Sequence, residues 1–284
     1  MTSLYRGRIA PSPTGFLHMG HARTFWLAQA RARQAGGSLI LRVEDIDPAR
    51  CKPEFHEALL EDLRWFGLAW DEGPDCGGPF GPYLQRERHG FHLALLERLR
   101  EGGFIYPCRC SRRDVCNALS APHAADEEPN YPGTCRPNAG AFTATEGLRD
   151  VHWRFRVPHG RRLTFTDTAC GLQTAVAGVD FGDFVVWRRD GVPAYQLAVV
   201  ADDAAMGITE VVRGADLLLS TFRQLLLYEA LGFPPPAFYH TSLLTDPATG
   251  QRLAKRHDAL SLRALRANGV TPEDLRQTGD PTGL

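Results

Sequence analysis

Short apolar runs alternate with longer helical repeats along the first hundred residues. Strands are predicted at 7–10 and at 38–43, where a continuous apolar run has the composition of a buried parallel strand. Helices are predicted where apolar residues recur at helical spacing, over 19–34, 53–66 and 89–100. This alternation predicts an α/β fold with a doubly wound, Rossmann-type sheet, in which ligands bind at the carboxyl ends of the strands.

The pattern changes after about residue 105. From 106 to 140 the chain is rich in Cys, Pro, Asn, Asp and Glu with little periodicity, which indicates an inserted, loop-rich module. A mostly β continuation of the insert is predicted, with strands at 153–156, 163–167 and 183–188 and a hairpin turn at 189–191. The apolar run at 195–200 predicts a buried strand and 220–231 a helix, which return the chain to the doubly wound sheet.

Charge and composition exclude several classes of protein. With 284 residues, 43% of them hydrophobic, and a net charge of −1, the chain is neither disordered nor broadly basic, so any nucleic-acid contact must be a local patch. The N-terminus has no apolar core of signal-peptide length, and the longest apolar stretch, 217–233, is interrupted by polar residues. We expect a cytoplasmic protein with no membrane partner.

Four of the seven cysteines, Cys108, Cys110, Cys116 and Cys135, lie close together in the insert. A cytosolic compartment keeps thiols reduced, so this cluster indicates a metal rather than a disulfide framework. Zinc binds four ligands, commonly thiolates, in tetrahedral geometry. By residue type alone, these four cysteines complete a site. Buried thiols are the alternative, but the segment has few apolar residues to hold it together.

Two further motifs suggest chemistry on a phosphate. The run P-S-P-T-G-F-L-H-M-G-H places His18, Gly20 and His21 at the start of a helix, where imidazoles and backbone N–H groups can hold a triphosphate. The run R-L-A-K-R places Lys255, one of only two lysines, in a basic loop near the end. A helix cap and a solvated basic turn are the alternatives when each motif is taken by itself.

Together these motifs resemble the two signatures of class I aminoacyl-tRNA synthetases of the glutamyl and glutaminyl branch. The first run is similar to the HIGH signature and the second to a divergent KMSKS loop, with Lys255 at its second lysine and without its serines. The resemblance implies ATP binding, with Mg²⁺, at His18, Gly20, His21 and Lys255. It assigns catalysis to His18, His21 and Lys255, which stabilise charge on the α-phosphate and on the leaving pyrophosphate.

The resemblance also implies a pocket for L-glutamate. It places Glu44 on the substrate ammonium, and Arg8 and Ser12 on the glutamate, with Arg8 suited to bidentate pairing with a carboxylate. The remaining residues of the implied pocket are Ile9, Ala10, Pro11, Tyr195 and Arg213. Taken singly, the charged and hydroxyl-bearing residues of this set are also compatible with a surface ion pair or a core hydroxyl.

The insert resembles the zinc module of glutamyl-queuosine tRNA(Asp) synthetases, whose pattern is C-x-C followed by Y-x3-C. This selects Cys108, Cys110, Tyr131 and Cys135 for one structural Zn²⁺. The spacer between Cys110 and Tyr131 is long, which keeps Cys116 and His123 as rival ligands. The isolated Cys51, Cys76 and Cys170 are expected to be structural.

The function implied by this resemblance is an ATP-dependent ligase that activates glutamate without tRNA. It then transfers glutamate to queuosine, carried by the anticodon arm of tRNA(Asp). The chain ends soon after Lys255, so we expect no anticodon-binding domain. A minimal glutamyl-tRNA synthetase charging a 3′ end and a non-catalytic tRNA-binding paralogue are the alternatives.

The predicted organisation is two halves of a catalytic domain around the insert. The first half covers 1–104, the zinc-binding and acceptor-type module 105–190, and the second half 191–250. Residues 251–284 hold the KMSKS-like loop and a helical tail. We expect a monomer.

Overall fold

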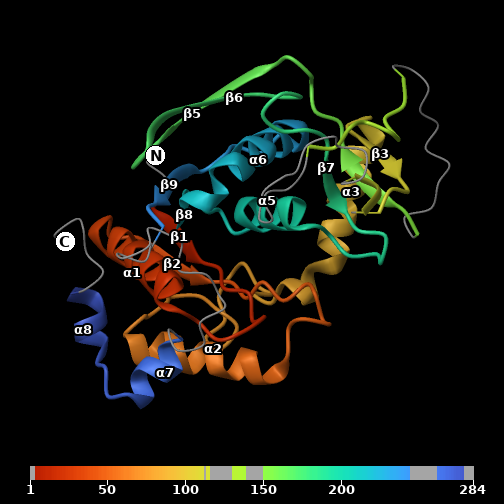
Figure 1. The fold of residues 1–284 in the computed structure, drawn as a ribbon. Helices are drawn as coiled ribbons and strands as arrows, with labels where there is room; N and C mark the ends of the chain where they lie inside the picture. The colour runs from red at the N-terminus through yellow and green to blue at the C-terminus, as the bar shows by residue number, and fades with distance from the viewer. Residues whose placement is uncertain (1–3, 112, 116–129, 139–149, 244–260, 278–284) are drawn as a thin grey trace.

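The computed structural model of the chain describes residues 4–111, 113–115, 130–138, 150–243 and 261–277, and Figure 1 shows their arrangement. The first parallel pair consists of β1 (Arg6–Ile9) and β2 (Ser38–Leu41), joined through α1 (Met19–Gln34). Helix α1 buries Ala22, Phe25, Ala28 and Ala32, whose spacing is that of one helical face. The sequence-predicted strand, helix and strand are confirmed.

Two more predicted helices complete the first half of the sheet region. Helix α2 (Pro53–Phe66) begins with a proline and ends at Gly67, whose φ of 93° only glycine adopts readily. Helix α3 (His89–Glu101) follows the 3₁₀ turn η1 (Gln85–Arg88). Both helices have the bounds that the apolar spacing predicts, to within one residue.

The second parallel pair lies beside the first. Strands β8 (Glu210–Gly214) and β9 (Ala237–Thr241) are joined by the 3₁₀ turn η2 (Ala215–Leu217) and by α6 (Leu218–Leu231). The two pairs meet where the Thr209 amide donates to the Arg6 carbonyl at 2.9 Å, next to β1 and β8. The carboxyl ends of β1, β2 and β8 therefore open at one edge, and the predicted α/β class is confirmed.

The predicted strand at 195–200 is wrong. These residues form the beginning of α5 (Tyr195–Ala205), and nearly every residue of this helix is buried. An apolar run that is buried on all sides has no visible period, so the sequence alone does not distinguish a buried helix from a buried strand. The helix continues through Asp202 and Asp203, which the apolar run does not include.

The insert is mostly β in the residues described, as predicted. Strands β3 (Ile105–Cys108), β4 (His152–Phe155) and β7 (Phe184–Trp187) form an antiparallel sheet in that order. Strands β5 (Arg162–Asp167) and β6 (Gly171–Val176) form a separate hairpin, drawn in green over α6 in Figure 1. The predicted turn at 189–191 is present, because the Arg188 amide donates to the Val192 carbonyl at 2.9 Å and Gly191 has a φ of 83°.

Helices α7 (Leu262–Ala267) and α8 (Pro272–Gln277) pack against the first half of the chain (Figure 1). Arg263 of α7 pairs with Glu61 of α2, and the Arg276 guanidinium of α8 lies 4.6 Å from the ring centre of Trp26 of α1. Among the described residues, no helix combines the length and the apolar character that a membrane crossing requires.

Candidate active site

The two histidines of the first motif lie at the beginning of α1. His18 is the N-cap of the helix, and its Nδ1 accepts a hydrogen bond from the Gly20 amide at 3.1 Å. The imidazoles of His18 and His21 stack with their centres 3.9 Å apart. A Cβ on Gly20 would lie 3.0 Å from Cε1 of His18, so a glycine lets this imidazole cap the helix.

The segment from Ile9 to Ser12 leads from β1 into this motif. Ile9 ends the strand and is buried, Ala10 is half-buried, Pro11 is buried and Ser12 is exposed. The Glu44 amide donates to the Pro11 carbonyl at 2.9 Å, which fixes the segment to the extension of β2. These predicted residues therefore lie at the carboxyl end of the sheet, beside Glu44.

Glu44 belongs to a buried group of charges. Its Oε1 lies 3.2 Å from Nη2 of Arg42, a fully buried arginine that also reaches Oδ1 of Asp203 at 2.6 Å. Burial raises the pKa of the Glu44 carboxyl, while the positive charges of Arg42 and Arg8 oppose this increase. A buried carboxylate in such a position can bind a substrate ammonium with little competition from water.

Arg8 lies near the same aspartate. Its Nη1 donates to the Val212 carbonyl at 2.9 Å, and its Nε lies 3.6 Å from Oδ1 of Asp203. The side chain is 4% exposed, so its position is determined by the protein rather than by solvent. Asp203 thus fixes both Arg8 of β1 and Arg42, which follows β2.

Tyr195 and Arg213 complete the predicted glutamate pocket. Tyr195 begins α5 and Arg213 is near the end of β8. Desolvation by the surrounding protein raises the pKa of the Tyr195 hydroxyl, on which the charges of Arg213, Glu44 and Arg8 also act, although 39% of the residue surface remains accessible. The structure therefore brings four predicted glutamate-binding residues, Arg8, Glu44, Tyr195 and Arg213, within electrostatic range of one another.

Lys255 lies outside the described residues, within 244–260. Both described flanks of that segment adjoin the beginning of α1. Before it, the hydroxyl oxygens of Thr241 and Thr24 are 3.4 Å apart. After it, Ser261 pairs with His18 as an isolated bridge, and the Leu262 amide donates to the Leu17 carbonyl at 2.8 Å.

Asp202 and Asp203 are buried residues that the sequence reasoning missed. Asp202 accepts from Gln85 at 2.7 Å and from Arg88 at 2.6 Å, and it contacts Nε2 of His92 at 2.9 Å. The signal was present as two adjacent aspartates within an apolar segment, because buried charges in native proteins are paired. Through their contacts with Arg8 and Arg42, these two aspartates support the residues of the predicted pocket.

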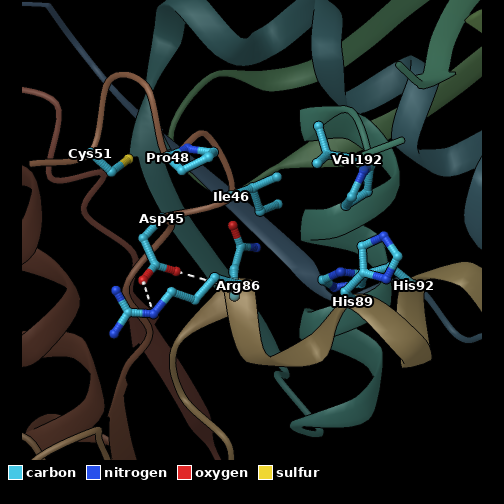
Figure 2. A pocket seen from close by; sticks show the side chains of 10 residues that line it. Asp45, Ile46, Pro48, Cys51, Arg86, His89, His92 and Val192 are labelled. Carbon is cyan, nitrogen blue, oxygen red and sulfur yellow. Dashed lines mark hydrogen bonds and ion pairs between the residues drawn. The ribbon is translucent and has the colours of Figure 1, made fainter. Parts of the chain in front are cut away.

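A cavity of about 180 Å³ lies next to Gln85 and His92, the partners of Asp202 (Figure 2). The Arg86 amide donates to Oδ1 of Asp45 at 3.0 Å, and the Arg86 Nε lies 3.4 Å from Oδ2. His89 and His92 form another part of the wall. None of the predicted site residues that the structure describes lines this cavity, which adjoins the predicted pocket through Asp45, the neighbour of Glu44.

Three of the four predicted metal ligands are cysteines that lie together at the end of β3. The sulfur atoms of Cys108, Cys110 and Cys135 all lie within 4.8 Å of one another, which is close enough to hold one metal ion. Oη of Tyr131 lies 3.4 Å from Sγ of Cys108 and 3.6 Å from Sγ of Cys110. The rival ligands Cys116 and His123 lie outside the described residues.

The surroundings of this cysteine cluster fit a metal that prefers thiolates. Arg154 donates from Nε to Sγ of Cys108 at 3.3 Å and places its guanidinium 3.9 Å from the ring centre of Tyr131. Burial tends to raise the pKa of the Cys135 thiol, but hydrogen bonds, first from Tyr131 and then from the Arg109 backbone, lower it to about 7. Three sulfurs and one oxygen at this spacing are a donor set that zinc can accept.

Comparisons with known proteins identify the family of this chain. The chain matches the catalytic domain of the class I tRNA synthetases (E and Q) over residues 5–278. It is 52% identical to a glutamyl-Q tRNA(Asp) synthetase of Nitratidesulfovibrio vulgaris, covering 94% of this chain and 82% of that protein. A protein of the same name from Symbiobacterium thermophilum is 53% identical, with 94% and 83% covered.

A solved structure supports the fold. The crystal structure of a glutamate tRNA ligase from Elizabethkingia meningosepticum, in complex with its amino acid, superposes with a TM-score of 0.77 at 32% identity. The match covers 89% of this chain and 52% of that one.

The chain therefore belongs to the class I tRNA synthetases of the glutamyl and glutaminyl type, and it is an aminoacyl-tRNA synthetase-like ligase. Within that family, its resemblance to the glutamyl-queuosine tRNA(Asp) synthetases is confirmed by the two relatives that carry this name.

Proposed function

We propose that this protein activates L-glutamate with ATP and transfers it to queuosine in the anticodon arm of tRNA(Asp). The observation that carries the proposal is that Arg8, Glu44, Tyr195 and Arg213 lie within electrostatic range of one another, with Glu44 hydrogen-bonded to the segment that leads into the two histidines. The names of its two relatives support the choice of acceptor. A tRNA substrate would place the reaction in the cytoplasm.

In the glutamate pocket, opposite charges face the two ends of the amino acid. Glu44 binds the substrate ammonium, and Arg8 and Arg213 bind carboxylate oxygens, with Ser12 and Tyr195 as hydroxyl partners. Ile9, Ala10 and Pro11 contribute backbone on the β1 side. Because Arg42 and Asp203 hold these groups before substrate arrives, little reorganisation is needed on binding.

Activation is an in-line attack of the glutamate α-carboxylate on the α-phosphate of ATP, which releases pyrophosphate. His18 and His21 bind the phosphates at the positive end of α1, where Gly20 lets the backbone approach them, and Lys255 stabilises the charge that develops on them. Mg²⁺ bound with ATP supplies further charge neutralisation. The hydroxyl of the acceptor then attacks the mixed anhydride and AMP leaves, so no covalent enzyme intermediate is required.

Cys108, Cys110, Tyr131 and Cys135 would hold one structural zinc ion that stabilises the insert. We expect metal analysis of the purified protein to give one zinc per chain. The Cys135→Ser variant should lose most of it, whereas Cys76→Ser, which changes an exposed cysteine, should keep it. Loss of zinc from Cys116→Ala together with its retention in Tyr131→Phe would transfer the fourth ligand to Cys116.

The activation half of the proposal is tested by pyrophosphate exchange without tRNA. Glutamate should support exchange, and Lys255→Ala should reduce it by about 100-fold or more, the usual size of a lost transition-state contact. The matched control is Lys52→Ala, which removes the only other lysine, an exposed one. Absence of glutamate-dependent exchange in the zinc-loaded protein would exclude this function.

Charging of a tRNA 3′ end is the second candidate, favoured by the match to a glutamate tRNA ligase in complex with its amino acid. The two candidates share the activation step and differ in the acceptor. They are separated by removing the terminal adenosine of the tRNA, which abolishes a 3′ ester but leaves an ester on the anticodon arm.

A further inference from the structure

Arg213 of the glutamate pocket is the end of a buried chain of three side chains. Its Nε donates to Nε2 of His240 at 3.0 Å, and its Nη2 donates to the hydroxyl of Thr221 at 2.7 Å. Nδ1 of His240 in turn lies 2.6 Å from Oδ2 of Asp167. Asp167, His240 and Arg213 are 1%, 1% and 4% exposed, so water does not compete for these bonds.

The three residues come from three separate elements. Arg213 and His240 are paired across β8 and β9 in the parallel register, and Asp167 ends β5 of the inserted hairpin. The hairpin reaches β9, since the Thr168 amide donates to the Phe238 carbonyl at 2.9 Å (Figure 1). The insert thus contributes a carboxylate to the support of a pocket that is otherwise built by the catalytic domain.

The direction of each hydrogen bond follows from the chemistry of its donor. A guanidinium has five N–H groups and no acceptor, so Nε2 of His240 must accept from Arg213 and carry no proton. The imidazole proton is then on Nδ1 and is donated to Asp167. Oδ1 of Asp167 also accepts from the amides of Ala169 at 3.0 Å and Cys170 at 2.8 Å, which keeps this carboxylate ionised and accepting.

We propose that Asp167 and His240 are positioning residues for glutamate binding: Asp167 fixes the Nδ1–H tautomer of His240, and that tautomer holds Arg213 in its binding orientation. The two bonds of Arg213 use Nε and one hydrogen of Nη2, so three N–H groups remain for other partners, a substrate carboxylate among them. The inference rests on the proposed role of Arg213 in binding glutamate. It adds a function for the hairpin, which sets the affinity for the amino acid from outside the pocket.

The test is steady-state pyrophosphate exchange by the zinc-loaded full chain, with glutamate and ATP varied separately. In Asp167→Asn the new amide can donate to Nδ1, which drives the His240 proton to Nε2, where it faces the Arg213 N–H. We expect the KM for glutamate to rise about tenfold or more, with the KM for ATP unchanged. His240→Gln, whose amide oxygen can replace Nε2 as the acceptor, should stay near wild type, whereas His240→Leu should behave like Asp167→Asn.

The matched control is Asp180→Asn in the turn after the same hairpin, which makes the same carboxylate-to-amide change at an acceptor of the Val176 amide but does not touch His240. Its KM for glutamate should not change. An unchanged glutamate KM in Asp167→Asn, or equal rises for glutamate and ATP, would overturn the proposal.

Nitrogen-15 NMR of the His240 imidazole measures its tautomer independently of enzyme activity. Wild type should show His240 protonated at Nδ1 and bare at Nε2, and Asp167→Asn should show the reverse. Protonation at Nε2 in the wild type would refute the positioning role. If the wild type gave no exchange with glutamate, the proposed function would fail, while the tautomer would still decide whether Asp167 and His240 orient Arg213.

Discussion

At the scale of single residues, the proposed function assigns the selectivity for an ammonium group to Glu44. Its side chain is only 10% exposed and lies between the substrate pocket and Arg42. Glu44→Gln keeps the volume but removes the charge, so kcat/KM for glutamate in pyrophosphate exchange should fall about 10- to 100-fold, as expected for one charge-assisted hydrogen bond.

The control for this change is Glu54→Gln, which removes an exposed carboxylate that pairs with Lys52 at the surface. Exchange by that variant should match the wild type. A Glu44→Gln enzyme with unchanged kcat/KM for glutamate would remove Glu44 from the pocket.

Gly20 tests the geometry of the nucleotide site. An alanine Cβ would come within 3.0 Å of Cε1 and 3.2 Å of Nδ1 of His18, so Gly20→Ala must displace this imidazole. We expect the KM for ATP to rise about tenfold, because small misplacements at a reacting site are costly. Gly90→Ala, at a helical glycine with no atom within 4 Å of the added Cβ, should leave the KM for ATP unchanged.

The sequence predicted the residues of the pocket but not those that support them. Arg8, Glu44, Tyr195 and Arg213 lie in motifs that resemble a family, so they could be found from sequence. Asp203 and Asp167 could not be found in that way, since each supports a partner far along the chain: Asp203 pairs with Arg42, and Asp167 with His240. The adjacent Asp202 and Asp203 in an apolar segment indicate that these carboxylates are paired, but this pattern does not identify their partners, which lie far along the chain.

At the scale of elements, the strength of the apolar period decided which predictions succeeded. Helices α1, α2 and α3 each bury one face, and their predicted bounds agree with the structure. Most residues of α5 are buried, and its apolar run predicts a strand where the structure has a helix.

The contact between α2 and α7 gives a prediction about stability. Asp62 of α2 is fully buried, and among the described residues neither of its carboxylate oxygens has a hydrogen-bond partner, although Nε of Arg263 lies 3.3 Å from Oδ1. Burial raises the pKa of Asp62 to about 6, outweighing the charge of Arg263. The folded state therefore holds a proton that the unfolded state, with a pKa near 3.8, has already lost.

Between about pH 4 and pH 6, stability should thus fall as the pH rises. Asp62→Asn removes the buried charge, so we expect its free energy of unfolding to exceed that of the wild type by about 1–3 kcal/mol at pH 7.5. The difference should nearly vanish at about pH 4, where both side chains are neutral in the folded protein. Glu61→Gln, at the exposed neighbour, should not stabilise the protein at either pH; urea unfolding at the two pH values measures all three proteins.

At the scale of the whole molecule, two parallel strand pairs and an insert converge on one edge. Asp203 of α5 fixes Arg8 of β1 and Arg42, which follows β2, and Asp167 of the insert fixes Arg213 of the second pair through His240. With a net charge of −1, the surface as a whole does not attract a polyanion, so under the proposed function we expect the tRNA to be bound by a local patch of arginines. Transfer should therefore be more sensitive to salt than glutamate activation is.

The identity of the acceptor is the central claim, and transfer of labelled glutamate tests it most directly. The protein is incubated with ATP and labelled glutamate together with tRNA(Asp) that contains or lacks queuosine, with the 3′-terminal adenosine present or removed. We predict label only on the queuosine-containing tRNA, with or without its terminal adenosine. Label on both tRNAs that disappears when the terminal adenosine is removed would contradict the account and identify a 3′-charging enzyme.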